Sequence, residues 1–254
     1  MLLKQEYDTV RRRSESICAP LKTEDYVVQP IVDVSPPKWH LGHTTWFFET
    51  FILIPNAKGY TEFDPQYNFV FNSYYESVGA RVIRTNRGNL SRPAVEDIMR
   101  YRKHVDEAMA VFLETPLTPE LEALFTLGLH HEEQHQELLY TDIKYILGHN
   151  PLFPAYDPAR KDAAPPRNNQ PDSWLNMRAG MYDIGFAGDG FCFDNELGRH
   201  KVYLGDYAIS NALVTNTEYL DFIQAGGYQD FRYWHAEGWD WVKNNQVATP
   251  MYWY

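Results

Sequence analysis

His-Glu-Glu-Gln-His, at residues 131–135, lies within an apolar-periodic run that extends from about residue 121 to residue 147. This periodicity predicts an α-helix, in which His131 and His135 are one turn apart and point the same way. Two imidazoles placed in this way can bind one metal ion. The stretch therefore predicts both a long helix and a metal-binding histidine pair on one of its faces.

The composition argues against several classes of protein. The chain has 254 residues, with 23 basic and 34 acidic side chains and a net charge of −11. Such a balance argues against nucleic acid or an anionic membrane as the main partner. No window approaches the ~20 apolar residues of a membrane-spanning helix, and the charged N-terminus is unlike a signal peptide. Cys18 and Cys192 are the only cysteines, so we expect no disulfide framework and a cytoplasmic location.

Four helices are predicted in the first part of the chain. Their start and stop signals place them at residues 1–20, 35–53, 91–113 and 118–148. Residues 55–90 join the second helix to the third. A connection of this length is uncommon in a compact domain and usually carries a function. We expect an antiparallel bundle whose core holds the metal site between facing helices.

The pattern of the sequence changes after a segment rich in proline, alanine and polar residues, from helical periodicity to short alternating runs. This segment, residues 155–172, predicts a linker between a helical domain of residues 1–154 and a second domain of residues 173–254. The predicted fold class is therefore α+β, with a four-helix bundle first and a mixed domain after it. In the second domain, alternating runs and one amphipathic segment predict strands at residues 181–184, 201–204 and 207–209 and a helix at residues 215–225.

A metal ion needs at least a third ligand, and His43 is the best candidate. It lies in the middle of a predicted helix, on an aromatic face that we expect to be buried. Three neutral imidazoles leave coordination positions open, as a catalytic site requires. Such a site suits zinc or iron(II), and the spacing does not separate these metals. The histidines at other helix faces or ends, and therefore less well placed, are His40, His104, His130 and His149.

The pattern H-E-x-x-H also fits a zinc-protease motif, in which Glu132 is the general base beside the metal. That class requires a third ligand further along the chain. Residues 138–145 contain no such continuation of the motif. The sequence therefore favours another chemistry for the histidine pair. The protease stays an alternative, because Glu132 is only about 100° around the helix from the two histidines, which does not exclude it as a base.

Several longer stretches closely resemble the ergothioneine-biosynthesis sulfoxide synthases, a family of non-haem iron enzymes. They are PPKWHLGHTTWFFE at residues 36–49, YN at 67–68, NSYY at 72–75 and HEEQHQE at 131–137. Residues 211–228 resemble the start of the family's second domain, which is similar to formylglycine-generating enzyme. The resemblance implies a DinB-like four-helix bundle followed by an incomplete α+β domain of the C-type-lectin-like kind.

The resemblance implies that His43, His131 and His135 hold Fe(II) on one face, with O2 as co-substrate. The thiolate of a cysteine-type substrate and the imidazole of Nα-trimethylhistidine (hercynine) would take the open positions. The implied product carries a new C–S bond at the imidazole C2 carbon and a sulfoxide. All-histidine ligation suits this chemistry because it leaves the soft thiolate as the anionic ligand.

The same resemblance implies further site residues. Gln134 matches the family glutamine that hydrogen-bonds the trimethylhistidine ring. Tyr74 and Tyr75 resemble the paired tyrosines of one subgroup, where a phenol can deliver a proton and steer the reaction toward C–S bond formation. That subgroup uses free cysteine rather than γ-glutamylcysteine, which favours cysteine here. Arg84 and Arg87 are candidates for binding the carboxylate of the thiol substrate through a guanidinium fork.

Each of these assignments has a structural alternative. The glutamine is otherwise a helix-surface residue, the tyrosines are loop aromatics packed on the bundle, and the arginines are solvated loop charges. Two other functions also fit part of the pattern. A DinB-like zinc-dependent thiol transferase or hydrolase would need no O2, but it would not explain the second domain.

A metal-binding fragment or partner subunit is the other alternative function. The family's second domain is much longer than residues 173–254. We therefore expect a truncated product, a fragment, or half of a split enzyme whose partner is the missing C-terminal half. In each case the metal site of the first domain should be intact.

Overall fold

The computed structural model describes residues 2–73, 79–158 and 173–253. It divides into two compact units, Met1–Lys161 and Asp162–Tyr254. The first unit is helical and the second contains the strands, so the predicted α+β class is confirmed. Most of the predicted linker lies outside the described residues, and its extent stays a prediction.

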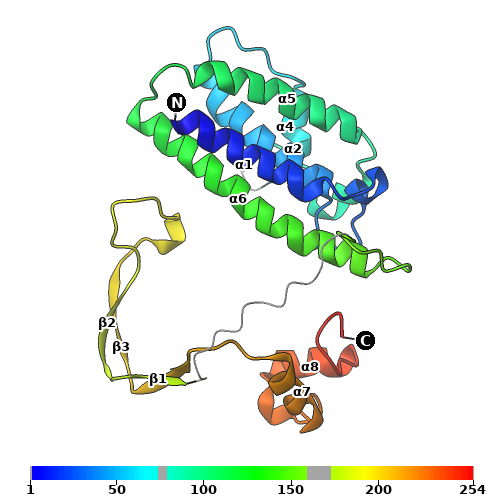
Figure 1. The fold of residues 1–254 in the computed structure, drawn as a ribbon, viewed down its shortest axis with the longest axis vertical. Helices are drawn as coiled ribbons and strands as arrows, with labels where there is room; N and C mark the ends of the chain where they lie inside the picture. Colours follow the sequence, from blue (N-terminus) through cyan, green and yellow to red (C-terminus); the bar gives the residue numbers. More distant parts are fainter. Residues whose placement is uncertain (1, 74–78, 159–172, 254) are drawn as a thin grey trace. The chain divides into compact units, whose positions relative to one another are not determined.

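The first unit is a bundle of long helices that lie side by side (Figure 1). The helix α6 packs against α1 and α2, and α2 also packs against α5. Each helix lies where the sequence predicts it, with ends that differ by a few residues. The bounds are α1 (Leu2–Cys18), α2 (Pro37–Phe48), α5 (Val95–Phe112) and α6 (Pro119–Gly148). None of the helices in the described residues is both long and apolar enough to cross a membrane.

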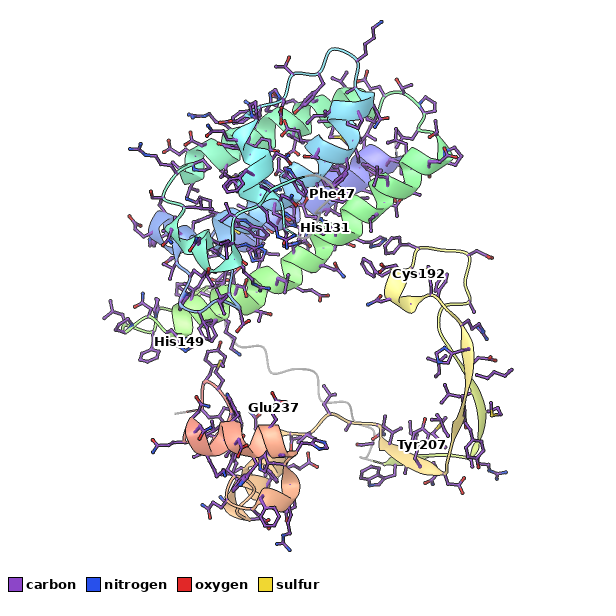
Figure 2. The ribbon with its side chains drawn as sticks, turned by 180° about the vertical axis from the view of Figure 1, so that it is seen from behind. Phe47, His131, His149, Cys192, Tyr207 and Glu237 are labelled. Carbon is purple, nitrogen blue, oxygen red and sulfur yellow. The ribbon has the colours of Figure 1, made fainter. Side chains whose placement is uncertain are left out.

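The helix α2 is the centre of the bundle, because all 12 of its residues are buried. It continues into a π-helical turn, Glu49–Leu53, which ends where the predicted helix ends. Glycine allows α6 to approach it closely: a Cβ on Gly128 would lie 2.8 Å from ring atoms of Phe47 and Phe48. Phe47 also lies beside His131, as Figure 2 shows, with ring centroids 5.1 Å apart. Aromatic side chains of α2 therefore pack directly on the backbone of α6.

In its described part, the long connection between α2 and α5 is held by short helices and by buried side chains. It contains α3 (Ile54–Asn56) and α4 (Gln66–Phe71), which are too short to give a sustained period in the sequence. Near its start, the buried carboxylate of Glu49 accepts a 2.6 Å hydrogen bond from the Tyr60 hydroxyl. Near its end, the Lys38 ammonium donates to the backbone carbonyl oxygens of residues 90 and 93.

The described residues of the second unit form two antiparallel ribbons and two α-helices. The strand β1 (Trp174–Met177) pairs with β4 (Tyr207–Ser210), and β2 (Gly180–Ile184) pairs with β3 (His200–Leu204). The three predicted strands and the predicted helix, now α7 (Asn216–Gln224), are confirmed. The structure adds β1 and a second helix, α8 (Ala236–Asn244), which begins without a side-chain cap. Short 3-10 helices lie at Thr23–Val27 and Arg84–Asn89 in the first unit. Two more lie in the second unit, at Asp194–Glu196 and Phe231–Tyr233.

The hydrophobic core lies in the first unit. Among the described residues of the second unit, Val242 is the one large apolar side chain that is buried. Large side chains of its ribbons stay exposed, including Trp174 at 69% and Tyr203 at 67%. Two-stranded ribbons are marginally stable in water without further packing. The bundle is therefore the part of the chain whose own packing holds a site rigidly.

The close approach of α6 to α2 gives a first prediction. Gly128→Ala should lower the free energy of unfolding by about 1–3 kcal/mol, because the new methyl group overlaps two aromatic rings of α2. Urea unfolding followed by circular dichroism measures this. Gly238→Ala in α8 is the control, since its Cβ meets only an ordinary 3.5 Å contact and should not destabilise the chain. Equal midpoints for the Gly128 variant and the wild type would contradict the packing described.

Candidate metal centre

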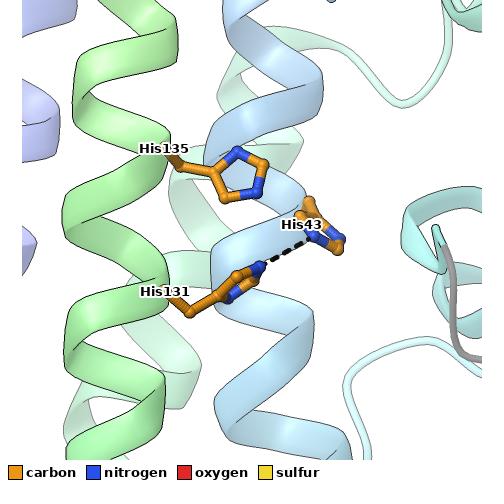
Figure 3. A group of neighbouring side chains, drawn as sticks. All are labelled: His43, His131 and His135. Carbon is orange, nitrogen blue, oxygen red and sulfur yellow. Dashed lines mark hydrogen bonds between the residues drawn. The ribbon is translucent and has the colours of Figure 1, made fainter. Parts of the chain in front are cut away.

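Three predicted metal ligands converge in the first unit. His43 comes from α2, and His131 and His135 come from α6, one turn apart (Figure 3). One nitrogen from each ring lies within 4.8 Å of the others. The Nε2 atoms of His43 and His131 are 3.2 Å apart. The structure thus brings together residues that are 88 positions apart in the chain.

Hydrogen bonding decides which nitrogen His43 turns toward the other two rings. Its Nδ1 lies 2.6 Å from the carbonyl oxygen of Phe71, the last residue of α4. A carbonyl oxygen only accepts, so Nδ1 carries the proton and Nε2 presents a lone pair. The ring also stacks with Trp39 and Trp46, at centroid distances of 4.6 and 5.6 Å. The long connection and the aromatic core therefore fix the orientation of this ligand.

The environment keeps the imidazoles neutral, which is the form that binds metal. Burial lowers the pKa of His131 to about 4. Burial, and then the neighbouring imidazoles, lower the pKa of both His43 and His135 well below the ordinary value. The Nδ1 atom of His131 is buried and has no hydrogen-bond partner among the described residues. Three neutral nitrogen donors around one point fit a divalent cation such as zinc or iron(II).

The three histidines line a cavity of about 430 Å³, a size typical of small-molecule sites. Gln134, Arg84 and Arg87, the predicted substrate-binding residues, also line it. The rest of the wall consists of Asp33, Ser35, Trp39, His40, Ser73, Leu138 and Asp142. Tyr74 and Tyr75 lie outside the described residues, so their role stays a prediction.

The two arginines of the cavity are held differently. Arg84 is exposed and donates from Nε and Nη2 to the carbonyl oxygens of residues 32 and 33, at 3.0 and 2.6 Å. Arg87 is buried and donates to two serine hydroxyls at 2.9 and 3.1 Å. Its Cζ atom lies 3.4 Å from the centroid of the Trp39 ring, a cation–π contact. Arg87 therefore places a fixed positive charge at the wall of the cavity, whereas Arg84 also ties two loops together.

The sequence ranks His40 below His43 as a ligand, although the two are three residues apart and both could face inward. The structure places His40 against His135. Its Nδ1 lies 2.8 Å from Nδ1 of His135, and its Nε2 lies 2.8 Å from Oδ2 of Asp142. Burial lowers the pKa of His40, although hydrogen bonding to Asp142 acts in the opposite direction. The spacing of three residues between His40 and His43 was the signal in the sequence, because such residues share a helix face. Nothing in the sequence pointed to Asp142.

Glu132 faces away from the three histidines, which contradicts the protease alternative. Its side chain is fully buried and is not part of the cavity wall. Its carboxylate accepts hydrogen bonds from Arg11 at 2.9 Å, Ser14 at 2.7 Å and Arg102 at 3.1 Å. Burial by itself raises the pKa of Glu132, but the two guanidinium groups outweigh it and lower the pKa to about 2. The carboxylate is a structural anion and not a base beside a metal.

The buried stripe of α6 also differs from the prediction. At helical spacing, Leu138 falls on one stripe with His131 and His135, which predicts that all three side chains face the core, yet Leu138 is 45% exposed. The core stripe instead runs through Phe125, Glu132, Leu139 and Ile143. The reason is that α1 covers this face of α6, while the histidines lie on the adjoining face and border the cavity with α2.

Two family models match the chain. The model of the DinB superfamily matches residues 6–139, which is more than half of the sequence. The chain belongs to the DinB superfamily. This DinB-superfamily chain also matches the sulfatase-modifying factor enzyme 1-like domain, over residues 160–252. The three histidines lie within the DinB match.

Curated relatives of this DinB-superfamily protein include three hercynine oxygenases. The Mycolicibacterium smegmatis protein is 24% identical over 225 residues, which is 87% of this chain and 50% of that protein. The Mycobacterium tuberculosis protein is 30% identical over 130 residues, or 51% and 30%. The Mycolicibacterium thermoresistibile protein is 25% identical over 228 residues, or 87% and 48%. The chain spans at most half the length of these relatives.

The buried position of Glu132 gives a second prediction. Glu132→Gln should lower the free energy of unfolding by about 3–5 kcal/mol, because it removes the one fully buried carboxylate between two buried guanidinium groups. Arg11 and Arg102 then keep only their partly exposed partners, Asp106 and Glu15. Glu133→Gln is the matched control: this neighbouring side chain is exposed and pairs with His130 on the surface, so we expect a change within about 0.5 kcal/mol. Chemical unfolding of both variants measures the difference. Two equally stable variants would show that Glu132 is not held as described.

Proposed function

We propose that this chain binds iron(II) through His43, His131 and His135 and serves an O2-dependent sulfoxide synthesis from Nα-trimethylhistidine and cysteine. The observation that carries the proposal is the convergence of three buried imidazoles from two helices on one cavity wall. The names of the curated relatives support trimethylhistidine as the substrate. The sequence resemblance supports the sulfoxide chemistry.

The overall reaction balances with one O2. The C2–H bond of the imidazole and the S–H bond of the thiol break, and a C–S bond forms, which removes two electrons. Oxidation of the sulfur removes two more. One oxygen atom becomes the sulfoxide oxygen and the other leaves as water. When bound, the iron supplies the activation of O2, for which three protein ligands leave coordination positions open.

The residues of the cavity have distinct tasks in this proposal. Gln134 lies in the helix between two ligands, and its amide can donate to and accept from the imidazole ring of trimethylhistidine. Arg87 offers a fixed guanidinium to the carboxylate of the thiol substrate, with Arg84 beside it. Tyr74 and Tyr75 follow the cavity residue Ser73 in the sequence, which supports their role as proton donors.

The donor set also favours a second candidate function. Three neutral imidazoles with open positions suit zinc as well as iron. A zinc-dependent thiol transferase or hydrolase would use the same ligands and the same cavity but would not consume O2. Dependence on O2 and on the identity of the metal therefore separates the two functions.

The proposal predicts a sulfoxide adduct. The chain is loaded anaerobically with Fe(II), mixed with trimethylhistidine and either cysteine or γ-glutamylcysteine, and started with O2, and the products are analysed by mass spectrometry. We expect the adduct with cysteine, and loss of both adduct and stoichiometric iron binding in His135→Ala. His130→Ala is the control, because this histidine lies on the same helix but pairs with Glu133 on the surface.

The outcomes of this assay separate the iron site from the whole reaction. Because the chain spans at most half the length of its curated relatives, iron binding is measured independently of turnover. Iron binding without an adduct would mean that the pocket for the substrates is incomplete in this chain. Zinc-supported activity without O2 would favour the second candidate. Absence of iron binding in the wild-type chain would contradict the three-histidine site.

A further inference from the structure

We infer that Asp142 and His40 are positioning residues that fix the tautomer and the ring orientation of His135, so that His135 turns a lone pair toward the cavity. The three side chains form one continuous hydrogen-bonded chain from α6 to α2 and back to α6. Its consequence for metal binding rests on the proposed function, whereas the hydrogen-bonded chain itself stands on the geometry. Neither Asp142 nor His40 has a part in the roles proposed above.

The chain of contacts is short and well buried. Oδ2 of Asp142 lies 2.8 Å from Nε2 of His40, and Nδ1 of His40 lies 2.8 Å from Nδ1 of His135. His40 is 2% exposed and Asp142 is 6% exposed. The His40 and His135 rings meet edge to face, with centroids 5.1 Å apart and an interplanar angle of 61°. Water therefore has little access to compete for these contacts.

The direction of each hydrogen bond follows from the first one. The backbone N–H of Ser35 also donates to Oδ2 of Asp142, at 2.9 Å, so this oxygen is an acceptor. His40 must therefore donate its Nε2 proton to the same oxygen, and the neutral ring then accepts at Nδ1. His135 supplies that proton from its own Nδ1. The Nε2 atom of His135 is left with the lone pair that a metal ion needs.

Such support is what metal-binding histidines generally require, because the second ring nitrogen needs an acceptor that holds the ring. In this site the ligands differ in their acceptor. His43 uses the backbone carbonyl of Phe71, which mutation cannot remove. His135 uses a side chain, which in turn depends on Asp142. A substitution of Asp142, which is not a ligand, can therefore change the orientation of His135, whereas no substitution removes the backbone acceptor of His43.

Tautomers provide a direct test in the metal-free full chain. Long-range proton–nitrogen correlation spectra of chain labelled with 15N-histidine distinguish protonation at Nδ1 from protonation at Nε2, and His135→Ala assigns the signal. We expect the wild-type His135 to be protonated at Nδ1. Protonation at Nε2 would overturn the inference without any substitution of Asp142 or His40.

Two substitutions of Asp142 separate its hydrogen bond from its charge. Asp142→Ala removes the acceptor, so we expect mixed tautomers of His135 and Fe(II) binding about 10- to 100-fold weaker. Asp142→Asn should restore the tautomer and most of the affinity, because the Ser35 N–H requires the amide oxygen at the position of Oδ2, where it also accepts from His40. Glu137→Ala, an exposed carboxylate on the same helix, is the matched control and should change neither property.

The outcomes keep this inference apart from the proposed function. Wild-type tautomer and affinity in Asp142→Ala would overturn it. Equal losses in the Ala and Asn variants would also overturn it, because they would assign the effect to charge and not to the hydrogen bond. A wild-type chain that binds no iron would contradict the proposed function, while the tautomer spectra of the metal-free chain still decide the role of Asp142 and His40.

Discussion

The buried carboxylate of Glu132 is the interaction on which the bundle depends. It lies on α6 and accepts hydrogen bonds from Arg11 of α1 and Arg102 of α5. Both arginines also donate to the hydroxyl of Thr45 on α2, at 2.9 and 3.2 Å. A buried ion that lost one of these partners would cost several kcal/mol, so all four helices must meet at this point. These contacts fix the register of α2 against α6, and this register places His43 of α2 opposite His131 and His135 of α6.

One helix therefore serves two kinds of chemistry on adjoining faces. Successive residues of an α-helix are rotated by about 100° around its axis, so the side chains of His131 and Glu132 point in different directions. The side covered by α1 holds a structural anion, and the side toward α2 holds neutral imidazoles with low pKa values. Keeping the carboxylate away from the histidines leaves an all-nitrogen donor set. This separation distinguishes the site from a zinc protease, although the two share the letters H-E-x-x-H.

The connection between α2 and α5 completes the site that the helices begin. It brings the Phe71 carbonyl to His43 and places Arg87 over the Trp39 ring at the cavity wall. Both contacts come from a segment without sustained periodicity, which is common for functional loops on a rigid scaffold. The bundle thus supplies the rigid ligands, and the connection supplies orientation and positive charge. The second unit has little core of its own, in contrast to the bundle.

The sequence by itself determined the local features. Periodicity and the Thr118 cap placed α6, and helical spacing paired His131 with His135. It did not decide which side of α6 would be buried, because that depends on the helix that packs against it. Only the tertiary structure set His40 beside His135, 95 positions away, and Arg11 beside Glu132, 121 positions away. Hydrophobic periodicity and helix caps depend on residues that are close in the sequence. The partners of a buried polar group depend on packing between segments that are distant in the chain.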